Sequence, residues 1–203
     1  TAFVGGDGME HKSQSRLKRK KELWDLIELS GYFNNGSTMS AGRAVGGNAT
    51  DRALLKYVSP GNPVLRNSYI KKDSVPFDSS IKFSAARIAP ASTSAGTREF
   101  NLVKGAPERI LPFCNRYFNE DGRICPLPGR LHLENKMKEM TERAVRVLAL
   151  AVSDTPVSAA GDFSRLILVG LVGIRDEIRP EARAAVKQVC DAGIQAVLIT
   201  GDN

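Results

Sequence analysis

The segment Glu99-Phe-Asn-Leu-Val-Lys-Gly-Ala-Pro-Glu108 decides how the rest of the chain is interpreted. Its apolar residues predict a strand that ends at Lys104, and Pro107 suits the first turn of a helix, where its missing N–H is not needed. Gly105 would let the backbone approach a ligand closely, and a lysine at the end of a strand suits a polyanion such as a nucleotide. The alternative is a strand–turn–helix junction with a solvated lysine.

The residues on either side predict a body that combines strands with helices. A strand over 81–88 precedes this one across a small-residue hairpin loop at 90–96, and another covers 146–152. Apolar spacing predicts helices at 22–29, 50–58 and 131–145, with Asn48 or Thr50 as the cap of the second. We expect loops at 34–47, which is polar and glycine-rich, and at 115–129, which contains the turn signal Asp121-Gly122.

The last forty residues predict a different arrangement. Residues 166–174 form a continuous apolar run, typical of a buried parallel strand, and residues 180–192 and 194–199 predict a helix and a further strand. Strand, helix and strand with short connections make a right-handed βαβ unit. We therefore expect an α+β domain over 1–158 and the beginning of a Rossmann-like domain over 159–203.

The composition indicates a soluble globular chain without a membrane span. Of the 203 residues, 42% are hydrophobic and 25% are charged, which disfavours disorder. The longest apolar run, 166–174, has about half the length that a bilayer crossing needs, and the N-terminal residues do not resemble a signal peptide. Three cysteines without a Cys-x-x-Cys pair, and only two histidines, argue against a disulfide framework, a zinc site or histidine-based catalysis.

Much of the net charge of +7 comes from one basic segment, residues 12–21. An arm that binds nucleic acid is one interpretation. A solvated surface beside the apolar face of the following helix is the favoured one, because no aromatic residue is interleaved among the basic side chains.

The final residues carry groups that suit a phosphate. Thr200 and Gly201 follow a predicted strand and can donate hydrogen bonds to phosphate oxygens, while Asp202 can hold Mg²⁺. Asp176 follows the neighbouring strand, so both carboxylates would lie at one sheet edge, as a phosphoryl-transfer site requires. A strand-ending turn is the alternative, and no nucleophile accompanies these residues.

Several motifs, found in the order in which that family carries them, resemble the P-type cation-transporting ATPases. Val172-Gly-Ile-Arg-Asp-Glu-Ile-Arg-Pro-Glu181, which precedes Ile194-Gln-Ala-Val-Leu-Ile-Thr-Gly-Asp-Asn203, is most similar to the calcium-pump branch. The others are Gly47-Asn-Ala-Thr-Asp51, Val75-Pro-Phe77 followed by Lys82, Lys104-Gly-Ala-Pro-Glu108, and Arg146-Val-Leu-Ala-Leu-Ala151. This resemblance implies a nucleotide-binding domain, an antiparallel sheet flanked by helices, followed by part of a phosphorylation domain of the haloacid-dehalogenase type.

The resemblance also implies two sets of site residues. In the first, Phe77 would stack on adenine while Lys82 and Arg146 would bind phosphates; the set is Thr50, Asp51, Phe77, Lys82, Lys104, Gly105 and Arg146. The second set, Asp176, Thr200, Gly201 and Asp202, would belong to the phosphate and Mg²⁺ neighbourhood of the phosphorylation domain.

Each role in the nucleotide site has a structural alternative. Phe77 would otherwise be a core residue, Asp51 a helix cap and Arg146 part of a surface salt bridge. The sequence also departs from the family pattern, since Asp51 is one methylene shorter than the usual glutamate and Ala49 replaces the usual proline. Both changes would weaken the contact with the base.

Membership of such a pump implies ATP and Mg²⁺ as cofactors, and the pump's own phosphorylation, actuator and transmembrane domains as partners. The chain would be a cytoplasmic domain of an integral membrane protein, with no nucleic acid expected. Because the Asp-Lys-Thr-Gly phosphorylation motif does not occur in the sequence, we expect nucleotide binding without turnover. The alternatives are a stand-alone phosphohydrolase of the haloacid-dehalogenase type, whose Asp-x-Asp motif is missing, and a basic nucleic-acid-binding module.

Overall fold

The computed structural model of the chain describes residues 2–11, 13–92, 98–158, 163–175 and 181–197. One large, mostly antiparallel sheet forms its centre, with the strand order β2-β1-β11-β10-β7-β6-β5. β8 pairs in parallel with β11 and antiparallel with β9. The strands are β1 Ala2–Val4, β2 Glu10–His11, β5 Tyr69–Asp78, β6 Phe83–Pro90, β7 Phe100–Gly105, β8 Cys114–Phe118, β9 Ile124–Pro126, β10 Arg146–Ser153 and β11 Leu166–Ile174.

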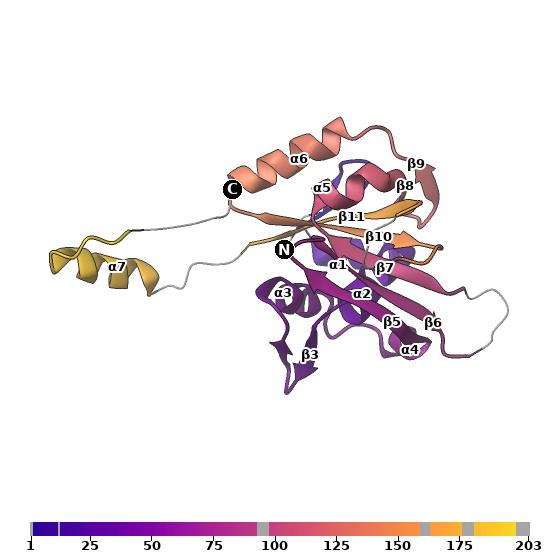
Figure 1. The fold of residues 1–203 in the computed structure, drawn as a ribbon, viewed down its shortest axis with the longest axis horizontal. Helices are drawn as coiled ribbons and strands as arrows, with labels where there is room; N and C mark the ends of the chain where they lie inside the picture. The colour runs from indigo at the N-terminus through magenta and orange to yellow at the C-terminus, as the bar shows by residue number, and fades with distance from the viewer. Residues whose placement is uncertain (1, 12, 93–97, 159–162, 176–180, 198–203) are drawn as a thin grey trace.

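Helices cover both faces of this sheet, as Figure 1 shows. α1 Gln14–Lys18, α2 Lys21–Phe33, α3 Ala49–Val58 and α4 Pro63–Asn67 lie on one side with a small hairpin, β3 Ser37–Ser40 and β4 Arg43–Gly46. α5 Pro107–Ile110, the 3₁₀ turn Leu111–Phe113 and α6 Leu131–Glu142 lie on the other. The architecture is therefore α+β with an antiparallel sheet flanked by helices, and that prediction is confirmed.

Side chains that point alternately to the two faces of the central strands divide the core into two layers. Leu102, Leu150 and Val152 pack toward α2 and α3, whereas Val103 and Ala151 pack toward α5 and α6. Successive side chains of a strand point to opposite faces, so an unbroken apolar run buries both sides of the sheet.

The pairing of β11 contradicts the predicted parallel βαβ unit. β11 pairs antiparallel with β1 and with β10, inside the same sheet as the N-terminal strands. Its continuous apolar sequence arises because helices cover both of its faces, which antiparallel strands also allow. Residues 194–197 do not form the predicted strand, and 198–199 lie outside the described residues.

The two predicted loops are also wrong, because each contains a hairpin. β3 and β4 turn at Ala41 and Gly42, which both have positive φ, at 47° and 75°. A two-residue turn of this kind is usually marked by Asn-Gly or Asp-Gly, so alanine in the first position concealed it. β8 and β9 turn around the recognised Asp121-Gly122 pair.

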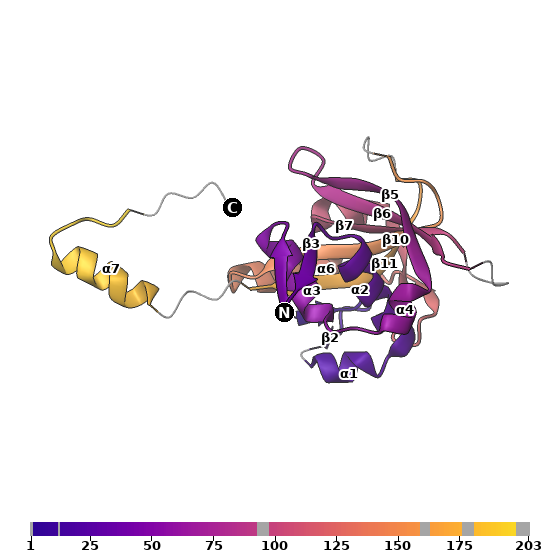
Figure 2. The ribbon, with the colours of Figure 1, turned by 90° about the horizontal axis from the view of Figure 1, so that it is seen from below.

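Helix α7, Ala182–Asp191, confirms the helix predicted near the C-terminus over most of its length. None of its residues is buried, and it lies apart from the sheet in both views (Figures 1 and 2). Among the described residues we find no helix with the length and apolar character to cross a membrane.

Candidate functional site

A pocket of about 460 Å³ opens where β7 ends and β10 begins. The turn between β5 and β6 and the first turn of α3 complete its walls. All seven residues of the first predicted set line it: Thr50, Asp51, Phe77, Lys82, Lys104, Gly105 and Arg146. The structure thus brings together residues from five segments of the sequence.

Lys104 and Asp51 form a buried ion pair at this pocket, since Lys104 is only 4% exposed and Asp51 only 7%. The Lys104 ammonium contacts Asp51 Oδ1 and donates a 2.8 Å hydrogen bond to the carbonyl of Asn34. Burial lowers the pKa of Lys104, and the carboxylate of Asp51 opposes this shift. The solvated lysine of the alternative interpretation is therefore wrong.

The pair is held by a segment that the sequence did not mark as functional, Asn34 to Gly36. The second oxygen of Asp51, Oδ2, accepts a 3.1 Å hydrogen bond from the N–H of Gly36. The Asn34 side chain donates to the carbonyls of Ser84 in β6 and Leu102 in β7, both at 3.0 Å. The sequence predicted only a polar loop there. The hydrogen bonds of Asn34 join residues far apart in the chain, so no local pattern could show its role.

The first turn of α3 orients Asp51. Asn48 caps this helix, since its Oδ1 accepts a 2.8 Å hydrogen bond from the N–H of Asp51. The structure thus selects Asn48 rather than Thr50 as the cap. Asp51 lies in the first turn, where the helix dipole favours a negative charge.

Phe77 is 52% exposed and lies near the end of the edge strand β5. It lines the main pocket and a neighbouring one of about 250 Å³. The core alternative for Phe77 is therefore wrong, and its ring offers a free face to a planar ligand.

Lys82 lies between β5 and β6 with φ at +59°, held by a 2.8 Å hydrogen bond from its N–H to the carbonyl of Asp78. Its ammonium is 3.4 Å from Glu108 Oε1, and both side chains are more than half exposed. Such a pair is weak, so Lys82 can exchange Glu108 for an anion at little cost.

Gly105 is required by the packing of its own sheet. A Cβ added to it would lie 2.5 Å from the carbonyl oxygen of Lys82 and 2.7 Å from Phe83 Cα. This close approach of β6 to β7 gives the glycine a structural reason, and its predicted role in ligand approach stays a prediction.

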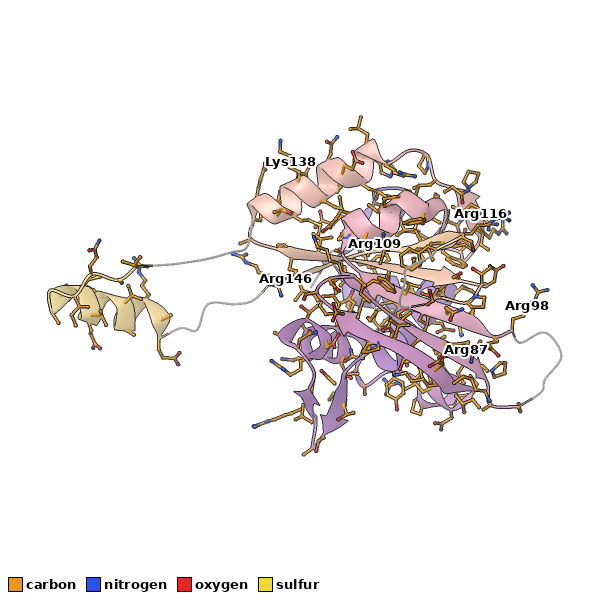
Figure 3. All side chains as sticks on the ribbon, in the orientation of Figure 1. Arg87, Arg98, Arg109, Arg116, Lys138 and Arg146 are labelled. Carbon is orange, nitrogen blue, oxygen red and sulfur yellow. The ribbon has the colours of Figure 1, made fainter. Side chains whose placement is uncertain are left out.

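Arg146 is the first residue of β10 and points away from the sheet (Figure 3). Its Nη1 lies 3.4 Å from Thr50 Oγ1, which connects β10 with the start of α3. Both residues line the main pocket. An exposed guanidinium in this position can bind the oxygens of a phosphate in pairs.

The second predicted set, Asp176, Thr200, Gly201 and Asp202, lies outside the described residues. Within the part of the chain that is described, no three His, Cys, Asp or Glu side chains gather to hold a metal ion. The pocket's two carboxylates, Asp51 and Glu108, face Lys104 and Lys82. Both carboxylates of the pocket are thus engaged with lysine side chains.

The basic segment packs against its own surroundings. Lys20 lies 2.6 Å from Glu120, Lys21 lies 2.5 Å from Asp25, and the Lys18 ammonium lies 5.2 Å from the centroid of the Trp24 ring. These contacts favour the solvated surface over a nucleic-acid arm.

Comparison with known proteins assigns the family. The family model described as P-type ATPase, cytoplasmic domain N, matches residues 26–181, so the chain belongs to the P-type ATPases. It is 29% identical over 198 residues to Calcium-transporting ATPase 1 of Yarrowia lipolytica, which covers 95% of this chain and 21% of the relative. It is 32% identical over 180 residues to the mouse Calcium-transporting ATPase type 2C member 2, covering 87% and 18%.

A bacterial relative is also similar over nearly the whole of this chain. The Calcium-transporting ATPase of Bacillus subtilis is 26% identical over 218 residues, covering 98% of this chain and 24% of the relative. The chain thus spans about a fifth of the length of the curated relatives it matches.

Proposed function

We propose that this chain binds ATP in the pocket between β7, β10 and α3, as the nucleotide-binding part of a cation pump. One observation carries the proposal: the seven residues that the family resemblance implies for nucleotide binding line a single pocket. A volume of about 460 Å³ lies within the range of small-ligand sites.

Each wall of the pocket has a separate task in this proposal. Phe77 stacks on the base, because half of its surface is free. Lys82 and Arg146, both on exposed turns or strand ends, neutralise and direct the phosphates. The Lys104–Asp51 pair is the rigid floor beneath the base. The work of the site is positioning rather than chemistry.

In the complete pump, the γ-phosphate of this ATP would pass to an aspartate of the phosphorylation domain. Asp176, Thr200, Gly201 and Asp202 would contribute to the phosphate and Mg²⁺ site of that domain. We propose calcium as the transported ion because the relatives named above are calcium-transporting ATPases. The actuator and transmembrane domains would complete a membrane protein in which this chain is cytoplasmic.

We also propose that the nucleotide-binding domain extends through β11 instead of ending at 158. Leu168, Val169 and Leu171 of this strand are fully buried within the shared sheet. The phosphorylation domain would then begin after Ile174.

Calorimetric titration with ATP tests the proposal. We expect saturable binding by the unaltered chain, without turnover, and a loss of about tenfold in affinity in Phe77→Ala, since stacking contributes roughly 1–3 kcal/mol. Ile70→Ala is the matched control, because Ile70 is 42% exposed on the same strand and does not line the pocket. Equal losses in both variants, or no binding at all, would contradict the proposal.

The two alternative functions, phosphohydrolase and nucleic-acid-binding module, predict different experimental results. A stand-alone phosphohydrolase would release phosphate steadily from ATP or a phosphomonoester. A nucleic-acid module would bind an oligonucleotide, with amide shifts centred on Lys18, while ATP left Phe77 unaffected. Family membership favours neither of them.

A further inference from the structure

Asp51, Lys104 and the side-chain oxygen of Asn48, which line the pocket together with Phe77, are already engaged in hydrogen bonds within the protein. Both carboxylate oxygens of Asp51 accept hydrogen bonds, one from the ammonium of Lys104 and the other from the N–H of Gly36. The Lys104 ammonium also donates to the carbonyl of Asn34. The side-chain oxygen of Asn48 is occupied by the N–H of Asp51.

Burial withdraws the same groups from a ligand. Asp51 and Lys104 are 7% and 4% exposed, whereas Phe77 is 52% exposed in the same pocket. Ala106, Val147 and Leu148 also line this pocket. A base that enters can therefore contact an aromatic face and apolar side chains, while the two buried charged groups stay paired with each other.

The opposite charges of Asp51 and Lys104 also cancel each other where a purine edge would lie. An unpaired carboxylate would attract the 6-amino group of adenine and repel the 6-oxo group of hypoxanthine or guanine, and an unpaired ammonium would do the reverse. Because Asp51 and Lys104 contact each other directly, a purine edge faces a neutral pair. Strong selection between such bases requires buried polar groups that only one base can satisfy.

We propose that this site holds purine nucleoside triphosphates by stacking and phosphate contacts, without distinguishing a 6-amino from a 6-oxo purine. The inference rests on the proposed nucleotide site and deepens it. Asp51 is the residue responsible, because its short side chain keeps the carboxylate in the ion pair with Lys104 instead of at the base.

Titration of the whole chain with ATP and with ITP tests the inference, because the two nucleotides differ only in the 6-substituent of the base and in the proton that the 6-oxo form carries on N1. We expect dissociation constants within about threefold of each other, a difference near RT. ATP binding tighter than ITP by more than this factor would overturn the inference and leave the proposed function intact. Failure of both nucleotides to bind would overturn the two together.

The variant Asp51→Glu provides a second test on the same pair of nucleotides. The added methylene lets the carboxylate extend past the ion pair toward the base, so we expect the preference for ATP over ITP to rise about fivefold or more. Asp73→Glu, on β5 and outside the main pocket, is the matched control and should leave the ratio unchanged. An unchanged ratio in Asp51→Glu would overturn the role given to Asp51.

Discussion

At the scale of single residues, the pair formed by Lys104 and Asp51 dominates the site. The two residues are 53 positions apart in the sequence and meet because β7 and the first turn of α3 converge on one pocket. Removing two charges from water is costly, and the cost is offset here by a direct ion pair and by hydrogen bonds from Gly36 and to Asn34. Loss of one partner would leave the other charge buried alone.

Lys104→Met should therefore lower the free energy of unfolding by about 3 kcal/mol or more, and Asp51→Leu should do the same. The double variant should lose much less than the sum, because no unpaired charge remains. Urea unfolding of the four proteins measures the coupling. Lys82→Met, which breaks an exposed pair with Glu108, should cost under about 1 kcal/mol. Additive losses at Lys104 and Asp51 would show that the pair is not coupled.

At the scale of elements, the packing of α2 against α3 places the pocket's floor. Trp24 of α2 meets Tyr57 of α3 edge to face, with ring centroids 5.7 Å apart. Leu54, Leu55 and Val58 of α3 are fully buried or nearly so in the same layer. This contact holds α3 in place, and Asp51 at its N-terminal end with it.

The Tyr57 hydroxyl gives this interface a pH dependence. Burial raises the pKa of Tyr57 from 10.0 to about 12, so between these values the folded chain keeps a proton that the unfolded chain loses. The free energy of unfolding should accordingly fall as pH rises from about 10 to about 12. Tyr57→Phe keeps the ring and should make this fall less steep in urea unfolding at several pH values.

A matched variant separates this effect from general alkaline unfolding. Tyr32→Phe alters a ring that is 41% exposed and should leave the slope as it is in the unaltered chain. Equal slopes for Tyr57→Phe and the unaltered chain would contradict the assignment.

At the scale of the whole molecule, β11 is the interior strand that joins the N-terminal strands to the rest of the sheet. It pairs with β1, β8 and β10, and so connects the N-terminal strand with the strand that carries Arg146. Its side chains contribute to both core layers, with Val169 and Val172 on one and Leu168 and Leu171 on the other.

A chain that ends at Ser158 should therefore fail to fold cooperatively, whereas a chain that ends at Arg175 should unfold like the unaltered protein. Four buried residues at roughly 1.5–3 kcal/mol each contribute an amount comparable to the whole stability of an ordinary domain. Circular dichroism with urea unfolding compares the two. A cooperative transition in the shorter chain would place the domain boundary at 158 after all.

The fold and the candidate site were predictable from the sequence where the signal was local. The apolar run before Lys104, the helix periodicity of α3 and α6 and the ordered motifs depend on neighbouring residues, and they led to the α+β class, the family and the seven pocket residues. That these seven residues bind nucleotide is still a prediction. The hairpin at Ala41 and Gly42 was not predicted because its turn lacks the usual Asn-Gly or Asp-Gly pair.

Sequence alone thus determined the longer helices, the central strands β6, β7 and β10, and the side chains that carry charge or an aromatic face. Only the tertiary structure decided that β11 pairs antiparallel with β1 and β10, since a strand covered on both faces has the same apolar composition in either kind of sheet. It also decided that Lys104 is buried, because its partner Asp51 and its support Asn34 come from distant segments. Burial and pairing are properties of the assembled fold, and no local pattern encodes them.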